Sequence, residues 1–276
     1  MAARLTPLPL AHADEEREYG GKAVSLGAAL RAGLPVPPGL ALPAPLVDRI
    51  ALGDSDALAA LVNSPHLPTG RLAVRSSAIG EDSADASFAG QHVTRLNVFE
   101  PTLADAVRAV WESARSASAL AYRRKRGIDG PPSIAVVVQQ LVEPMAAGVL
   151  FTRDPITGAD ERWIEAAWGL GEAVVAGLVS PDRYRLDRGG RLLEQVVGRK
   201  DIKIWFDETH GTAEMPVRDD LHEAPCLTGR HLTELHALAD RCCSVWGDSL
   251  DLEWAVTPDD TVYLLQSRPI TTLRPS

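Results

Sequence analysis

Apolar residues recur at helical spacing along residues 102–114, which predicts an amphipathic helix. Thr102 is placed to cap this helix in a capping box with Asp105. The apolar positions that share one face of the helix are Leu103, Val107, Val110 and Trp111. One face of the helix should therefore be buried against a core.

Two further helices are predicted, each with a stop signal at its end. Residues 228–247 start at Thr228, a good capping residue, and end at Gly247, which tolerates a positive φ. Their apolar positions are Leu232, Leu235, Ala239, Cys242 and Trp246. A shorter helix over residues 23–32 ends at Gly33, and prolines follow it.

Strands are predicted where short apolar or β-branched runs lie between turn residues. These runs cover residues 71–75, 134–140, 148–152, 162–167, 182–186, 250–256 and 261–266. We expect residues 148–152 to pair with 134–140 across a turn, and residues 191–206 to hold a hairpin or meander. Helices mixed with antiparallel pairs predict an α+β fold rather than a doubly wound parallel sheet.

The composition is that of a globular protein, with 45% hydrophobic and 24% charged residues. A formal charge of -9 disfavours binding to nucleic acid, which needs an excess of Lys and Arg. Three cysteines without a CxxC pair indicate free thiols in a reducing compartment. We find neither a signal peptide nor an apolar run long enough to span a membrane, so we expect a cytoplasmic protein without a membrane partner. None of the seven histidines is assigned a catalytic role, and we expect His231 and His236 at or near the surface.

Two segments carry residues suited to binding phosphate. Gly20, Gly21 and Lys22 at a helix start offer backbone N–H groups and an ammonium, although an ordinary turn before a helix is the simpler interpretation. Their spacing is not that of a Walker A loop. Arg75 ends a predicted strand and precedes a loop rich in hydroxyls and glycine, whose amides can close over an anion. An ordinary polar surface loop explains this second pattern equally well.

The two closing strands hold the most informative group of polar residues. Asp251 and Glu253 are two apart on one strand, and Gln266 and Arg268 are two apart on the next. If the strands pair as a hairpin, all four side chains share one face of the sheet. Carboxylate and amide oxygens suit Mg²⁺, and Arg268 can steady a phosphate during transfer. The alternative is a row of polar residues on a solvated strand face.

Taken together, these segments make the chain resemble the nucleotide-binding domain of phosphoenolpyruvate synthase, pyruvate phosphate dikinase and rifampicin phosphotransferase. The matching blocks follow the family's order and span nearly the whole chain. They are GGKAVSLGAALRAGLPVPPGL (20–40), AVRSSAIGEDSADASFAGQHVTRLNV (73–98), IAVVVQQLVEPMAAGVLFTRDPITG (134–158), IEAAWGLGEAVVAGLVSPDRY (164–184), DLEWAV (251–256) and LLQSRPIT (264–271). This resemblance implies an ATP-grasp fold, in which two α+β lobes, roughly 1–140 and 141–276, clamp Mg-ATP as one nucleotide-binding unit.

The resemblance also implies roles for individual residues in the first half of the chain. Lys22 and Arg75 would hold phosphates and take part in catalysis, and the loop from Gly90 to Thr94 would cover the phosphates. The adenine and ribose would lie against two further positions, Gln139 and Glu143.

In the second half, the resemblance implies the same four residues that the hairpin argument selects. Glu253 and Gln266 match the metal-binding positions, with Asp251 supporting them. Arg268 would lie on the phosphates and act in catalysis. The family's usual SSAT segment has Ile79 in place of its threonine here, which removes a hydroxyl near the phosphate loop.

Members of this family pass phosphate through a histidine on a separate swivelling domain, marked by a Thr-Ser-His motif. That motif does not occur in the 276 residues, and we expect neither a carrier nor a substrate domain in them. The expected function is therefore transfer of a (pyro)phosphoryl group from Mg-ATP to a histidine on a carrier domain or subunit, with release of AMP, for phosphorylation of a small molecule.

Three alternatives remain open on the sequence. The chain can be a stand-alone ATP-grasp kinase or ligase that acts directly on a small molecule. It can be a nucleotide-binding subunit without turnover, or a piece of a longer enzyme.

Overall fold

The computed structural model describes residues 5–78, 93–125, 132–209 and 211–270. The structure divides into two compact units, and each is made of several separate segments of the chain. Unit 1 comprises residues 1–28, 38–141 and 209–211, and unit 2 comprises residues 29–37, 142–208 and 212–276. Each unit combines helices with antiparallel strands, which confirms the predicted α+β class.

Unit 1 is built on a five-stranded antiparallel sheet with the strand order β1-β2-β5-β3-β4. Its strands are β1 (Leu8–Pro9), β2 (Gly39–Leu42), β3 (Leu72–Ser77), β4 (Thr94–Val98) and β5 (Ala135–Gln140). Alternate residues of β2, β3 and β5 are buried in one core with α2 and α4; these are Leu40, Leu42, Leu72, Val74, Val136 and Val138. Because side chains alternate along a strand, the residues between them face the other side of the sheet.

The helices of this part of the chain are short, apart from the 16-residue α1. They are η1 (Leu10–His12), α1 (Glu16–Arg31), α2 (Ala44–Ala51), α3 (Ser55–Val62), η2 (Glu100–Thr102), α4 (Leu103–Ser113) and α5 (Ala117–Lys125). Helix α1 is kinked at Gly20, whose φ of 76° and ψ of 166° are not helical. The predicted helix over residues 23–32 is therefore the part of α1 that follows this kink. The sequence prediction missed α2 altogether.

The predicted capping box of α4 is wrong. Thr102 is the last residue of a 3-10 turn, and its side chain makes no capping hydrogen bond to α4. Instead, Thr102 Oγ1 donates to the carbonyl of Phe99 at 3.1 Å and accepts from the Phe99 N–H at 3.3 Å. The hydroxyl is used to close the preceding turn, so it cannot cap the helix.

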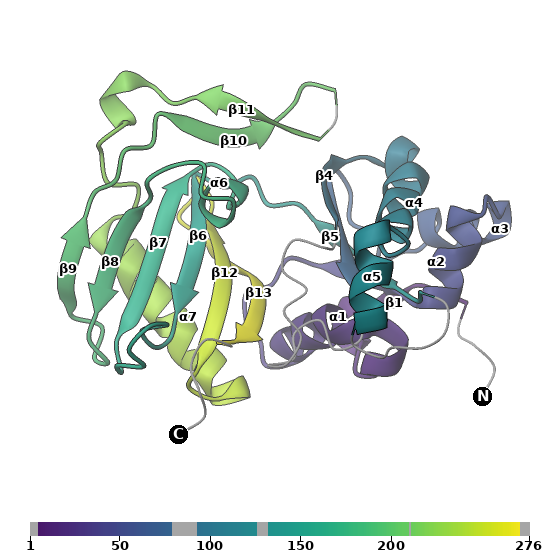
Figure 1. The fold of residues 1–276 in the computed structure, drawn as a ribbon, viewed down its shortest axis with the longest axis horizontal. Helices are drawn as coiled ribbons and strands as arrows, with labels where there is room; N and C mark the ends of the chain where they lie inside the picture. The colour runs from purple at the N-terminus through teal and green to yellow at the C-terminus, as the bar shows by residue number, and fades with distance from the viewer. Residues whose placement is uncertain (1–4, 79–92, 126–131, 210, 271–276) are drawn as a thin grey trace. The chain divides into compact units, whose positions relative to one another are not determined.

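Unit 2 contains a six-stranded antiparallel sheet with the strand order β13-β12-β6-β7-β8-β9. Its strands are β6 (Ala146–Phe151), β7 (Arg162–Trp168), β8 (Asp182–Leu186), β9 (Leu192–Val196), β12 (Leu250–Val256) and β13 (Val262–Pro269). Helix α7 (Gly229–Trp246) crosses behind this sheet, and the short α6 (Glu172–Val175) lies at one end of it (Figure 1). Thr228 caps α7 and Gly247 ends it, as predicted.

A separate two-stranded sheet, β10 (Ile202–Phe206) with β11 (Thr212–Pro216), follows β9. The hairpin or meander predicted within residues 191–206 is wrong, because β9 pairs with β8 and β10 pairs with β11. A buried ion pair between Lys200 and Asp182 ties the start of this segment to β8. The Asp182 carboxylate also accepts the backbone N–H groups of Gly198 and Cys226, at 2.9 and 2.8 Å.

Two further expectations are corrected by the structure. Strand β6 does not pair with β5; it lies between β7 and β12 in the other unit, so the segment between β5 and β6 is a crossing and not a hairpin turn. His231 is buried rather than at the surface. Both ring nitrogens have partners there, since Nδ1 accepts the N–H of Thr228 at 3.2 Å and Nε2 contacts Asp260 Oδ1 at 2.8 Å. No helix in the described ranges is long and apolar enough to cross a membrane.

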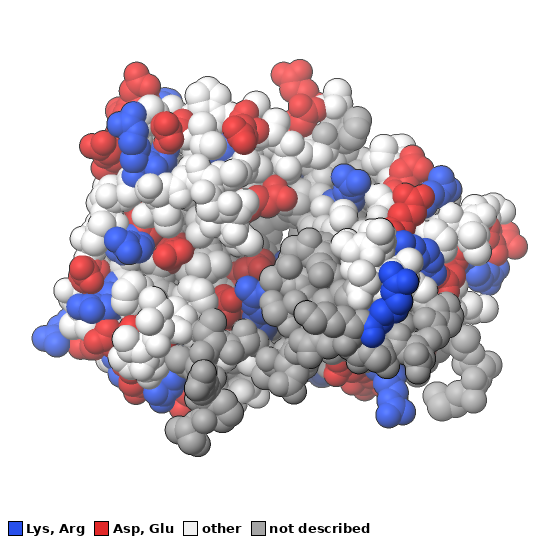
Figure 2. Space-filling view, in the orientation of Figure 1, with Lys and Arg blue, Asp and Glu red and all other residues white. Residues whose placement is uncertain are grey.

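The described charged residues are of mixed sign on the face shown in Figure 2, where Lys and Arg lie among Asp and Glu.

Candidate functional site

The end of β3 and the start of the helical part of α1 are held together by backbone contacts in unit 1. The N–H of Gly21 donates to the carbonyl of Ala78 at 3.0 Å, and the N–H of Ala23 donates to Ser77 Oγ at 3.0 Å. This places Lys22, which is buried, beside the end of the strand that carries Arg75. The prediction of a loop directly after Arg75 is wrong, because β3 continues through Ser77.

Three of the predicted nucleotide residues lie on one face of the sheet in unit 1. Arg75 is paired with Thr94 on β4, and the residue two before it, Ala73, is paired with Gln139 on β5. Paired residues share a face, and so do residues two apart on a strand. Arg75, Thr94 and Gln139 therefore all lie opposite the face that packs against α2 and α4.

The structure says less about the other residues that were predicted in the first half of the chain. Glu143 is exposed and belongs to unit 2, in the segment between β5 and β6. Gly90 and Ile79 lie outside the described residues, so the loop from Gly90 to Thr94 stays a prediction.

In unit 2, the closing strands pair in the register that the sequence argument required. Asp251 on β12 is opposite Arg268 on β13, and Glu253 is opposite Gln266. The register shifts directly after Glu253, so Leu265 is the extra residue of a bulge. Two carboxylates, an amide and a guanidinium therefore occupy adjacent positions on one sheet face.

Asp251 and Arg268 form the best-defined contact of this group. Asp251 Oδ2 accepts a hydrogen bond from Arg268 Nε at 2.8 Å and forms an ion pair with Nη2 of the same side chain, also at 2.8 Å. The other carboxylate oxygen, Oδ1, is buried and has no hydrogen-bond partner within the described residues. Burial raises the pKa of Asp251 above its ordinary value; Arg268 lowers it in part, and the charge of Glu253 raises it again.

The same group has the chemistry expected of a magnesium site. The free Oδ1 of Asp251, the carboxylate of Glu253 and the amide oxygen of Gln266 are hard oxygen donors. Magnesium prefers six oxygen ligands and is commonly held by one or two carboxylates, substrate phosphates and water. These residues therefore fit a cation that arrives with a nucleotide.

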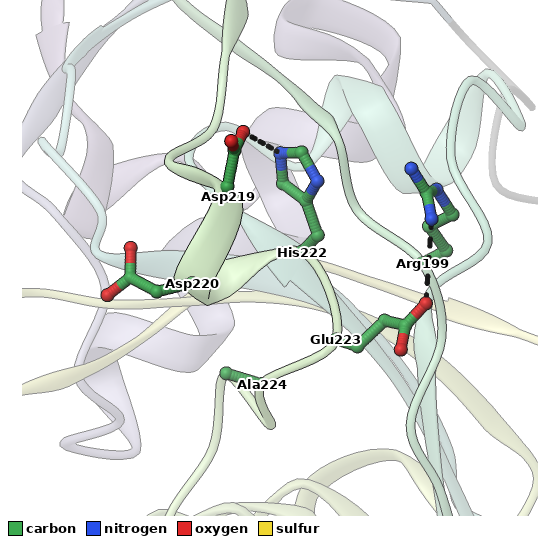
Figure 3. Close-up of a pocket in the computed structure, with 6 residues that line it drawn as sticks. All are labelled: Arg199, Asp219, Asp220, His222, Glu223 and Ala224. Carbon is green, nitrogen blue, oxygen red and sulfur yellow. Dashed lines mark ion pairs between the residues drawn. The ribbon is translucent and has the colours of Figure 1, made fainter.

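A cavity of about 290 Å³ elsewhere in unit 2 does not have this chemistry. Figure 3 shows its wall, where His222 faces Asp219 and Arg199 faces Glu223, at 3.7 and 3.5 Å. Three carboxylates line it, including Asp220, and they would repel the phosphates of a nucleotide. Its basic groups are already paired with carboxylates, so we do not place the site there.

The sequence analysis missed a contact between Gly20 and Ser77 that positions Lys22. Ser77 is buried and accepts the Ala23 N–H, and Gly20 lies so close to Ser77 that a side chain would not fit between them. Both were visible in the sequence as parts of the GGK and RSS runs. The hydrogen bond between Ala23 and Ser77 joins residues 54 apart in the chain, which no local pattern reveals.

Comparison with known proteins identifies a family for most of the chain. Residues 42–276 match the family described as pyruvate phosphate dikinase, AMP/ATP-binding domain. The match includes β3, β5 and the β12–β13 hairpin, and so it covers both groups of candidate residues except Lys22.

Three curated relatives illustrate how similar this chain is to longer proteins. A probable phosphoenolpyruvate synthase of Methanothermobacter thermautotrophicus is 37% identical over 92% of this chain and 44% of its own length. The prodigiosin synthesizing transferase PigC of Serratia marcescens is 38% identical over 94% of this chain and 32% of its own. A rifampicin phosphotransferase of Streptomyces sviceus is 41% identical over 74% of this chain and 24% of its own. The chain thus spans less than half the length of each relative.

Among solved structures, the VanG D-Ala:D-Ser ligase of Enterococcus faecalis aligns with 90% of this chain and 52% of its own, with a TM-score of 0.46 and 10% identity. That likeness is too low to carry an argument. The sequence match over residues 42–276 shows that this chain belongs to the family of pyruvate phosphate dikinase AMP/ATP-binding domains.

Proposed function

We propose that the chain binds Mg-ATP and transfers a pyrophosphoryl group to a histidine on a carrier domain or subunit. The observation that carries this proposal is the β12–β13 register, which sets Asp251 opposite Arg268 and Glu253 opposite Gln266 in a chain of the AMP/ATP-binding family. The terminal phosphate of the resulting pyrophosphohistidine is then hydrolysed or passed on, and the phosphohistidine that remains delivers its phosphate to a small-molecule acceptor. Names of the longer relatives, phosphoenolpyruvate synthase and rifampicin phosphotransferase, support phosphate transfer as the reaction class.

The proposed transfer needs no nucleophile from this chain, because the carrier histidine is the attacking group. A neutral imidazole nitrogen of the carrier attacks the β-phosphorus of ATP, and the bond from that phosphorus to the oxygen of AMP breaks. AMP leaves with that oxygen and its electron pair, and the imidazole loses its N–H proton to solvent. The chain's part is to hold the phosphates in line and to neutralise their charge.

Each candidate residue has a defined part in this proposal. Lys22 and Arg75 bind phosphate oxygens, and Arg268 steadies the group in transfer while Asp251 fixes the orientation of its guanidinium. Bound Mg²⁺, held by Glu253 and Gln266, would supply charge neutralisation at the phosphates.

The same proposal includes an ATP-grasp fold and names the residues that bind the nucleoside. Units 1 and 2 would be the two lobes of one ATP-grasp nucleotide-binding unit. Gln139 and Glu143 would bind the adenine and ribose, and the segment from Gly90 to Thr94 would cover the phosphates.

The deciding experiment compares Glu253→Gln with the wild-type chain. Calorimetry measures Mg-ATP binding, and chromatography quantifies AMP, ADP, phosphate and pyrophosphate with and without a histidine-carrier domain. Glu253→Gln should lower metal-dependent turnover by about 100-fold or more, since even residues that only support metal ligands are worth 10–100-fold. Its melting temperature should stay near that of the wild type, because a partly exposed carboxylate adds little stability.

Glu234→Gln on α7 is the matched control, since this carboxylate is also partly exposed but pairs with Arg230 at 3.0 Å. It should behave as wild type. AMP formed only in the presence of the carrier supports the proposal. ADP, or AMP without a carrier, would instead make the chain a stand-alone kinase or ligase. Tight ATP binding without product under every condition would indicate a subunit without turnover.

A further inference from the structure

The loop between β6 and β7 exposes a large apolar side chain at its tip. Ile156 is 88% exposed, more than any other large hydrophobic residue within the described ranges, the next being Leu52 at 75%. Single exposed apolar residues are common on protein surfaces and need no explanation alone. The surroundings of Ile156 make this one different.

The loop that carries Ile156 is fixed by hydrogen bonds to one buried carboxylate. Asp154 Oδ1 accepts the N–H groups of Ile156 and Thr157, at 2.8 and 3.1 Å. Asp154 Oδ2 accepts the Thr157 hydroxyl at 2.6 Å, and the backbone of Asp154 bonds to both Gly158 and Ala159. Because the loop is held in one conformation, a partner that binds it loses little conformational entropy.

Paired charges surround this loop. Asp160 lies 3.9 Å from Arg153 and 3.5 Å from Arg188, and Arg188 also contacts Asp248 at 3.4 Å. The loops after β6, β8 and α7 thus brace one another through exposed ion pairs. An apolar tip with a polar surround is the usual arrangement of a protein-binding anchor.

The loop also adjoins the phosphate-handling residues. It begins after Phe151 and leads into Trp163, and these two aromatic residues are paired across β6 and β7. Phe151 is in turn paired with Asp251, which is paired with Arg268. Neighbouring strands are about 4.8 Å apart, so the two rings and the Asp251–Arg268 pair form one continuous row on the same sheet face.

We propose that Ile156, Phe151 and Trp163 form the docking surface for the protein segment that presents the accepting histidine, an inference that rests on the proposed function. A carrier must bring its imidazole to the phosphates beside Arg268, and Phe151 and Trp163 lie in one row with that residue. A rigid apolar tip on the loop that joins the strands of these two aromatic residues fits a protein surface better than a small polar acceptor. The longer relatives contain polypeptide beyond the part that matches this chain, which is where such a segment can reside.

The test compares Ile156→Glu with Leu52→Glu, a control that places the same charge at an exposed apolar residue of unit 1. The probe is the Methanothermobacter relative expressed without the segment that matches this chain. Binding is measured by surface plasmon resonance, and transfer by labelling of the probe from ATP labelled at its β-phosphate. Ile156→Glu should weaken binding and labelling by roughly 10- to 100-fold, as at other interface anchors, while Leu52→Glu leaves both unchanged.

Two further measurements separate this inference from the proposed function. Mg-ATP affinity should be the same in wild type and Ile156→Glu, since Ile156 makes no contact in the proposed nucleotide site. Asp154→Ala, which frees the loop, should also weaken probe binding.

If wild type binds Mg-ATP but Ile156→Glu binds the probe as well as wild type does, the docking surface is refuted and the nucleotide site is not. A wild-type chain that binds Mg-ATP and never binds the probe equally refutes the assigned partner. Loss of Mg-ATP binding in the wild type would refute the proposed function itself.

Discussion

Gly20→Ala tests whether close backbone contact is what places Lys22. Gly20 has a φ of 76°, and a Cβ there would lie 2.0 Å from the carbonyl oxygen of Ser77 and 2.5 Å from its Oγ. The carbonyl cannot move away without disturbing β3, and the hydroxyl accepts the Ala23 N–H. Alanine should therefore push the helix start away from the strand end.

The magnitude follows from comparison with a second glycine of unit 1. Gly70 also has a positive φ, 84°, but a Cβ there meets no atom within 4 Å. Gly70→Ala should cost only the left-handed backbone penalty, about 1–2 kcal/mol. Gly20 has a ψ of 166°, which puts it in a backbone region almost exclusive to glycine, so Gly20→Ala carries a backbone penalty of about 1–3 kcal/mol. To this it adds about 1–3 kcal/mol for overpacking and about 1–3 kcal/mol for a buried hydrogen bond that is lost. The expected total is about 3–9 kcal/mol, a large share of the 5–15 kcal/mol typical of a protein.

Urea unfolding followed by far-UV circular dichroism gives the two free energies of unfolding. Gly20→Ala should be less stable than Gly70→Ala by about 2 kcal/mol or more, which is the sum of its additional costs at their lower limits. Calorimetry in the absence of urea should show weaker Mg-ATP binding for Gly20→Ala alone. Equal losses of stability in the two variants would refute the reasoning, because the contact with Ser77 would then be irrelevant.

Two other predictions concern buried charges in unit 2. Lys200→Met should lower the free energy of unfolding by about 3–5 kcal/mol, because Asp182 would stay buried without its cation, whereas Arg199→Met removes an exposed ion pair and should cost roughly 0–1 kcal/mol. Similar losses in urea unfolding would contradict this. The other prediction follows from burial, which raises the pKa of Asp251 above its ordinary 3.8 although Arg268 lowers it. A folded pKa above the unfolded value means that the stability this group adds is present below the unfolded pKa and is lost as the pH rises through the folded one. Mg-ATP affinity needs the carboxylate, so it should have the opposite dependence and fall as the pH drops through the raised pKa. Calorimetric titrations over the acid range check this, and Asp251→Asn should remove that part of the pH dependence; an unchanged profile would exclude Asp251 as its origin.

Elements with strong local signals were predicted well from the sequence. Helix α7 has a capping threonine, helical spacing of apolar residues and a terminal glycine, and it begins and ends where these indicate. The β12–β13 hairpin also followed from its alternating pattern and the acidic turn between the strands, and the shared sheet face of its four polar residues was predicted correctly. In both, the residues that decide the structure are neighbours in the chain.

Predictions failed where a residue's partner is distant or where two local uses compete. Nothing in residues 134–152 shows that β5 and β6 enter different sheets, because a buried strand looks the same whichever strand pairs with it. Thr102 is suited both to a helix cap and to a 3-10 turn, and the turn is what the structure uses. The surface position expected for His231 was wrong because Asp260, from the β12–β13 turn, contacts its ring.

The sequence by itself determined the α+β class, the two amphipathic helices, the closing hairpin and the four polar residues on its face. Each depends on periodicity or spacing within about 20 residues, which backbone geometry converts directly into a shared face. Only the tertiary structure decided which strands share a sheet, that Ser77 and Gly20 meet beside Lys22, and that Phe151 and Trp163 continue the row of Asp251 and Arg268. These depend on contacts between residues far apart in the chain, which are selected by the packing of the whole unit and leave no local pattern in the sequence.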